Sequence, residues 1–210
     1  MFKNIFVSVL IWVIEALVVA AMISVSWSHR IGELEEKWMI SYIGQEQTEI
    51  IQAKAQALYS GAFLETGVME NSYYFFIPSE EERSRSLGFE DFGRKDIFPF
   101  IRSRLDVIWM SVYQICQRIF MIGIWAPYAL ILLVPFITDG MVNRKIKQYG
   151  FDYSSPFLHR YSVWVFGLVC YISFLALFAP IPIPISIMPF ACMLMAVSLG
   201  VFASNVQKRL

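Results

Sequence analysis

The sequence predicts an all-α, four-span helical membrane protein with a mainly helical extracytoplasmic segment between spans 1 and 2. Three observations predict this fold. Of the 210 residues, 57% are hydrophobic and only 16% are charged, against about 25% charged in ordinary soluble proteins. Four apolar runs approach or exceed the roughly 20 residues that a helix needs to cross a bilayer. The one strongly basic stretch joins the second run to the third.

The four runs divide the chain into five expected parts. Residues 1–27 hold the first transmembrane helix, 28–118 form the extracytoplasmic (periplasmic) helical segment, and 119–138 hold the second transmembrane helix. A basic cytoplasmic connection, 139–160, leads to a transmembrane hairpin and a short basic tail, 161–210. The first run is longer than the apolar region of a signal peptide, about 7–15 residues, which favours a retained helix over a cleaved one.

Prolines mark the second span and the turn of the hairpin. Pro127 and Pro135 lie in the second run, where each removes a backbone donor and is expected to kink the helix. The alternating prolines of segment 179–184 cannot continue a helix. The third run, about 161–178, and the fourth, about 185–204, are therefore expected to form a tight antiparallel hairpin.

Basic residues near the span ends predict the orientation. Lys3 marks the N-terminus, residues 144–147 mark the connection, and Lys208 marks the C-terminus. With four spans, these three basic segments fall on one side of the membrane, which the positive-inside rule makes cytoplasmic. We therefore expect a multi-pass membrane protein with both termini in the cytoplasm.

The extracytoplasmic segment is expected to hold two helices and a loop. Apolar residues recur at helical spacing over 33–59, and a second helix begins near Asp96 or Pro99 and continues into the second span. Residues 69–95 are expected to be irregular. The aromatic run within them, 73–76, is either a strand or core plug, or a contact surface for a partner in the envelope. Apolar clusters under long loops are common, which favours the strand or core plug.

Glu15 lies in the middle of the first run, where a carboxylate is costly. One interpretation is a proton or ion relay. The other is a polar contact with a neighbouring helix or with another membrane subunit. A relay usually needs several titratable groups, and no second acidic residue lies inside the apolar runs, so the contact is favoured.

The basic connection begins with the pattern Asp139-Gly140-x-x-x-Arg144. A similar pattern occurs in membrane phosphatidyltransferases that bind two metal ions, but the further aspartates that those enzymes need are absent. A simpler interpretation is that Asp139 caps a short helix and Gly140 allows a tight exit from the membrane. The candidate contacts with lipid headgroups or a partner are then Asp139, Arg144, Lys145 and Lys147.

Common catalytic and metal-binding patterns are absent from the sequence. It contains no GxxxxGK[ST], no GxSxG and no HExxH. Three cysteines without a CxxC pair and two widely separated histidines do not form a pattern of metal ligands. We therefore expect no enzyme activity, no catalytic residue and no cofactor. We also expect no direct nucleic-acid site, since three adjacent basic charges are too few for one.

The connection and the hairpin resemble a known family. The stretch Asp139-Gly140-Met141-Val142-Asn143-Arg144, the pair Ser154-Ser155 and His159 are similar to a pattern in inner-membrane proteins of integrating conjugative elements and conjugative plasmids. The proline-rich segment 180–189 and the tail 207–210 resemble that family's ending. The resemblance is clearest over 139–210, and the chain departs from it at Arg160, where the family often has a lysine.

The resemblance implies a part of the conjugative DNA-transfer apparatus, encoded near the coupling ATPase that delivers DNA to the type IV secretion channel. It also implies no enzymatic activity. We therefore expect a non-catalytic subunit of the bacterial inner membrane that docks or stabilises the coupling ATPase or contacts other type IV secretion subunits. The alternatives are a small stand-alone membrane enzyme or transporter, and an entry-exclusion protein. Membrane lipid is an expected partner, and the small residues Gly167 and Ala203 in the spans leave room for a homo-oligomer.

Overall fold

The computed structural model describes residues 22–77, 97–150 and 155–206. Regular structure in these residues is helical throughout, without a strand, which confirms the all-α class. Most of the predicted first span, with Glu15, lies outside the described residues, as do most of the loop 69–95 and the basic tail. The chain divides into two compact units. The N-terminal unit ends at Phe120 and also includes Phe178–Pro182, and the C-terminal unit holds Met121–Leu177 and Ile183–Leu210.

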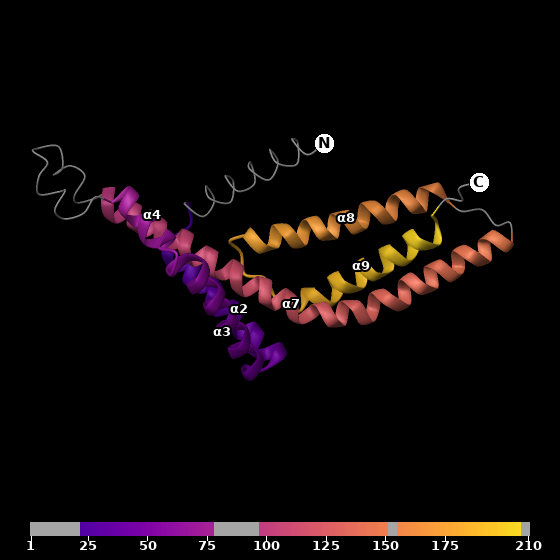
Figure 1. Cartoon of the computed structure of the whole chain (residues 1–210), viewed down its shortest axis with the longest axis horizontal. Helices are drawn as coiled ribbons and strands as arrows, with labels where there is room; N and C mark the ends of the chain where they lie inside the picture. The colour runs from indigo at the N-terminus through magenta and orange to yellow at the C-terminus, as the bar shows by residue number, and fades with distance from the viewer. Residues whose placement is uncertain (1–21, 78–96, 151–154, 207–210) are drawn as a thin grey trace, which may run out of the picture. The chain divides into compact units, whose positions relative to one another are not determined.

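The N-terminal unit is built from helices that the sequence analysis had partly merged (Figure 1). They are α2 (Val25–Ile43), α3 (Gln45–Tyr59), the π-helix η1 (Ser60–Leu64), α4 (Val68–Phe76) and the first part of α7 (Ile97–Tyr149). The single helix predicted over 33–59 is wrong. Gly44 separates α2 from α3 with φ 85°, a conformation that residues with a Cβ rarely adopt.

Two further boundaries differ from the predicted ones. Val25 to Trp27, assigned above to the first apolar run, begin α2, because the Ser24 side chain caps that helix by accepting a hydrogen bond from the Trp27 backbone N–H at 3.3 Å. The aromatic run 73–76, expected to be irregular or a strand, lies in α4. Aromatic residues favour strands only when they pack on a pleated surface. Here the helical turn directs Tyr73 inward and leaves Phe75, 82% exposed, outward.

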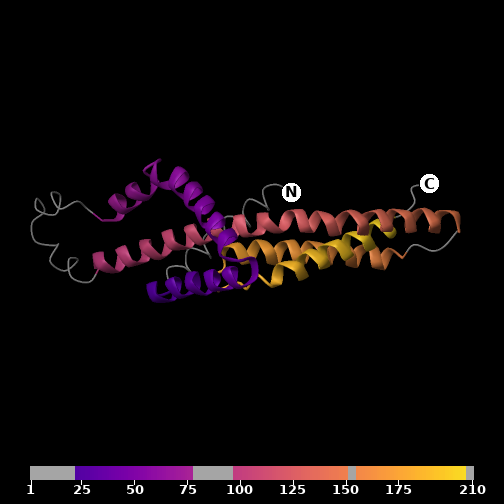
Figure 2. The same ribbon diagram turned by 90° about the horizontal axis from the view of Figure 1, so that it is seen from below.

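The core of the N-terminal unit is aromatic. Ala55 and Tyr59 of α3 pack against Trp109 and Cys116 of α7, and residues of η1 and α4 close the cluster. Tyr59 meets Trp109 edge-on, with ring centroids 6.4 Å apart and the planes at 76°, an arrangement that adds to simple burial. Figure 2 shows α2 running beside the first part of α7. The start of α7 at Ile97 agrees with the helix predicted to begin near Asp96 or Pro99.

The C-terminal unit contains the rest of α7 with α8 (Pro156–Phe178) and α9 (Ile187–Ser204). Figure 1 shows α9 between α8 and this part of α7. Helices α7, α8 and α9 are long and apolar enough to cross a membrane, which is compatible with a multi-pass membrane protein. Few residues of their apolar stretches are buried, as expected of surfaces that meet lipid.

The structure shows how the helices of this unit start and where the chain leaves helical structure. The Ser155 hydroxyl accepts a hydrogen bond from the Leu158 backbone N–H at 3.4 Å, and Pro156 is the first residue of α8, so Ser155 caps this helix. The proline-rich segment after Phe178 is non-helical until α9, as predicted. Helix α7 continues through Pro127 and Pro135 to Tyr149, so neither proline ends it.

The predicted roles of Asp139 and Gly140 at a helix boundary are wrong, because both residues lie inside α7. Gly140 is buried against α9 instead. A Cβ built on Gly140 meets the carbonyl oxygen of Gly200, and a Cβ built on Gly200 meets the carbonyl oxygen of Phe136 at 2.8 Å. The two glycines therefore let the backbones of α7 and α9 approach to direct contact, a common device of membrane helices.

Candidate functional site

The N-terminal unit contains an open groove of about 730 Å³, within the range of about 300–1,000 Å³ typical of ligand pockets. Helices α2, α3, α4 and α7 supply its lining. The lining includes three acidic residues and no lysine or arginine, and its floor is aromatic. The residues that give the groove this character are Glu33, Glu36, Asp106, Tyr73, Trp109 and Tyr113.

Hydrogen bonds fix the walls of this groove. The Tyr73 hydroxyl of α4 donates to Asp106 Oδ1 of α7 at 2.5 Å. Trp109 Nε1 donates to the Ser72 hydroxyl at 3.0 Å, so the same two helices are joined twice. On the opposite side, Gln52 Nε2 of α3 donates to Glu36 Oε1 of α2 at 2.9 Å. These bonds within the chain hold the lining helices together, so the groove does not need a ligand to form.

The Tyr73–Asp106 bond predicts how the unit responds to alkali. Burial, and then the hydrogen bond to Asp106, raise the pKa of Tyr73 above its ordinary value of 10.0. The folded state thus holds this proton more tightly than the unfolded state. Its contribution to stability is present below about pH 10 and is lost as the pH rises through the folded-state pKa.

We expect the free energy of unfolding of the N-terminal unit to fall between about pH 8 and pH 11, and to fall less in Tyr73→Phe, which has no phenol to ionise. Urea unfolding in detergent at both pH values measures the difference. Tyr74→Phe, on the same helix but 60% exposed, is the matched control and should keep the wild-type fall. An equal fall in all three proteins would contradict the assignment.

Beside the groove, α2 and α7 are joined by a buried ion pair. Arg118 Nη2 and Nε donate to Glu35 Oε1 at 2.6 and 3.1 Å, and the two side chains are only 3% and 5% exposed. Gln114 Nε2 also donates to the Ser28 carbonyl of α2 at 3.0 Å. A buried ion pair is tolerable only when its remaining hydrogen-bonding groups are satisfied.

The proline-rich segment supplies further partners for Arg118. Its Nη1 donates to the Ala179 carbonyl at 2.7 Å, and its Nη2 donates to the Ile181 carbonyl at 2.8 Å. The carbonyl between them, that of Pro180, accepts a hydrogen bond from Trp27 Nε1 at 3.3 Å. Prolines lack the backbone N–H that would continue a helix, so these carbonyls take side-chain donors instead. The guanidinium thus binds one carboxylate and two carbonyls at once.

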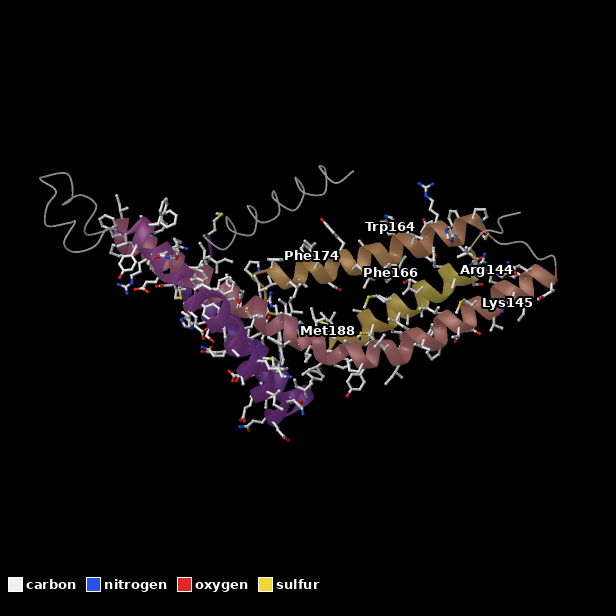
Figure 3. All side chains as sticks on the ribbon, viewed as in Figure 1. Arg144, Lys145, Trp164, Phe166, Phe174 and Met188 are labelled. Atoms are coloured by element: carbon white, nitrogen blue, oxygen red, sulfur yellow. The ribbon has the colours of Figure 1, made fainter. Side chains whose placement is uncertain are left out.

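The residues predicted to contact lipid or a partner lie elsewhere, in the C-terminal unit. Figure 3 labels Arg144 and Lys145 in the last turns of α7. Lys147 Nζ donates to Ser204 Oγ at 3.1 Å and to Asn205 Oδ1 at 3.3 Å, so it interacts with the C-terminal end of α9, where the helix dipole favours a cation. Asp139 accepts a hydrogen bond from Asn143 at 3.0 Å.

Sequence reasoning therefore placed four candidate residues on one helix end and missed the groove and the ion pair. In the sequence, Glu35 lies near the start of the helix expected over 33–59, and Arg118 is the last residue of the expected segment 28–118. An arginine directly before a span was the available signal, but its partners lie 83 positions before it and 61 positions after it. In the described residues, no group of three or more His, Cys, Asp or Glu is placed to hold a metal ion.

A protein-family model described as "IncC plasmid conjugative DNA transfer protein DtrJ-like" matches residues 20–207. The chain belongs to the DtrJ-like family. This match confirms the resemblance to conjugative-plasmid proteins and extends it from the hairpin to both units. No curated protein and no solved structure matches the chain. Membership of the DtrJ-like family indicates a role in conjugative DNA transfer, and the groove and the Glu35–Arg118 pair both lie in the part of the chain that defines it.

Proposed function

We propose that the chain is a non-catalytic, multi-pass inner-membrane subunit of a conjugative DNA-transfer, type IV secretion machine, and that it docks or stabilises the coupling ATPase. The DtrJ-like match over residues 20–207 carries this proposal. In it, α7, α8 and α9 anchor the chain in the membrane, and the N-terminal unit presents the groove to a partner on the periplasmic side. Arg144, Lys145 and Lys147 contact lipid headgroups on the cytoplasmic side.

The construction of the N-terminal unit supports docking. Its groove is open, and its polar side chains hold neighbouring helices together by hydrogen bonds. The groove combines carboxylates with tyrosines and a tryptophan, a composition that suits recognition of another molecule.

The function is tested by deletion and by co-purification. We expect deletion of the gene to abolish plasmid transfer in a mating assay while leaving pilus assembly mostly intact, and a copy supplied in trans to restore transfer. The tagged chain, extracted in mild detergent, is expected to bring down the coupling ATPase. Recovery of neither the ATPase nor any channel subunit, with the chain present at normal level, would contradict docking.

A further inference from the structure

We propose that the groove of the N-terminal unit binds a basic segment of a partner protein, with arginine or lysine side chains lying over its aromatic floor and beside its carboxylates. The inference rests on the docking function proposed above and specifies the chemistry of the surface that is docked. It depends on three features of the groove, which are its acidic lining, its aromatic floor and the contacts that hold the floor side chains in place.

The lining of the groove is more acidic than basic. Glu33 and Glu36 of α2 and Asp106 of α7 contribute to it together with His29, and no lysine or arginine lines it. Glu33 and Glu36 lie in exposed positions, so an incoming cation can reach both carboxylates. Complementary charge steers association and rejects partners of the wrong sign. A phosphate-bearing nucleic acid or lipid is disfavoured here, because carboxylates repel it.

Aromatic rings form the floor of the groove. Tyr59, Tyr73, Trp109 and Tyr113 contribute to the lining. Tyr59 and Trp109 are buried in the core, so the half-buried Tyr73 and Tyr113 are the rings that a cation can reach. Cationic side chains are attracted to the faces of tyrosine and tryptophan rings, and arginine is the more frequent partner. A groove that combines these rings with carboxylates therefore suits arginine and lysine better than it suits neutral polar or purely apolar side chains.

The floor is held in place before a ligand binds. Tyr59 packs edge-on against both Trp109 and Tyr113, and the Tyr59–Tyr113 centroids are 5.6 Å apart with the planes at 83°. Tyr73 is fixed by its hydrogen bond to Asp106. Binding therefore spends little free energy on ordering these side chains.

The test uses the full-length chain in detergent and a short fluorescent peptide in which arginine alternates with serine and glycine. This peptide has no apolar face that would attach it to micelles. Glu33→Gln combined with Glu36→Gln removes two charges from the lining, and the new amide oxygen at position 36 can still accept the hydrogen bond from Gln52. Glu46→Gln combined with Glu49→Gln removes the same charge from exposed positions of α3 outside the groove. Fluorescence anisotropy measures the dissociation constants.

We expect the Glu33–Glu36 double variant to weaken binding roughly tenfold, and the α3 double variant to bind like the wild type. Tyr113→Leu, which keeps an apolar side chain and removes the ring, is also expected to weaken binding. Equal affinity of the wild type for the arginine peptide and for a glutamine version would overturn the inference. So would equal effects of the two double variants. Neither result decides whether the chain docks the coupling ATPase, which co-purification tests separately. If the arginine peptide binds as expected but the ATPase does not co-purify, the proposed docking function is overturned and the groove proposal is not.

Discussion

Replacing Arg118 by methionine is expected to lower the free energy of unfolding of the N-terminal unit by about 3–5 kcal/mol. The substitution keeps a long apolar side chain but leaves the Glu35 carboxylate buried without its arginine, and it removes the donors to two carbonyls of the proline-rich segment. Urea unfolding in detergent, with hydrogen exchange read by mass spectrometry over α2 and α7, measures the loss.

A double-mutant cycle identifies the cause of that loss. Arg118→Met combined with Glu35→Leu removes both charges, so we expect the double variant to recover part of the stability, as buried ion pairs replaced by apolar residues often do. Arg102→Met, on the same helix in an exposed position, is the matched control and should change stability by no more than about 0.5 kcal/mol. If Arg118→Met behaves like Arg102→Met, the ion pair has no structural role.

Gly140→Ala and Gly200→Ala are expected to destabilise the C-terminal unit by about 1–3 kcal/mol each, because each added methyl group is forced against a backbone carbonyl of the opposing helix. A backbone contact cannot relax by rotating a side chain, so α7 and α9 must separate. Thermal unfolding in detergent, together with hydrogen exchange over α7 and α9, measures the effect.

Alanine in place of a glycine that has open space around it should not lower the free energy of unfolding. Gly123 of α7 and Gly167 of α8 have no atom within 4 Å of an added Cβ. Alanine there should be neutral or stabilising by up to about 1 kcal/mol, since it favours the helix over glycine. Destabilisation of equal size at all four glycines would show that glycine itself is needed in these helices, and that the α7–α9 contact is not the reason.

Composition and local pattern were enough to predict the helical class and the three helices that are long and apolar enough to cross a membrane. The apolar runs that became α8 and α9 are uninterrupted, and the prolines between them exclude a helix by their covalent structure. The start of α8 at Ser155 and Pro156 can also be read from the sequence, because a capping residue and the first helical turn are neighbours in the chain. These features are local, so a single sequence contains them.

The missed features depend on distant parts of the chain. Gly140 was interpreted as an exit from the membrane, and only its contact with Gly200 of α9 shows why a residue without a side chain lies there. The groove is formed by helices from four parts of the sequence, and the role of Glu35 follows from a partner on another helix. Gly44 gave no periodic signal of its own, so its left-handed conformation was not expected.

The bonds made by Arg118 imply an order of events during synthesis. Glu35 leaves the ribosome well before the arginine, whereas Ala179 follows it by 61 positions. At about 5–20 residues per second, the Ala179 carbonyl is synthesised about 3–12 seconds after the arginine. The proline-rich segment can therefore complete the contacts of Arg118 only late in synthesis, after the Glu35 carboxylate is already available.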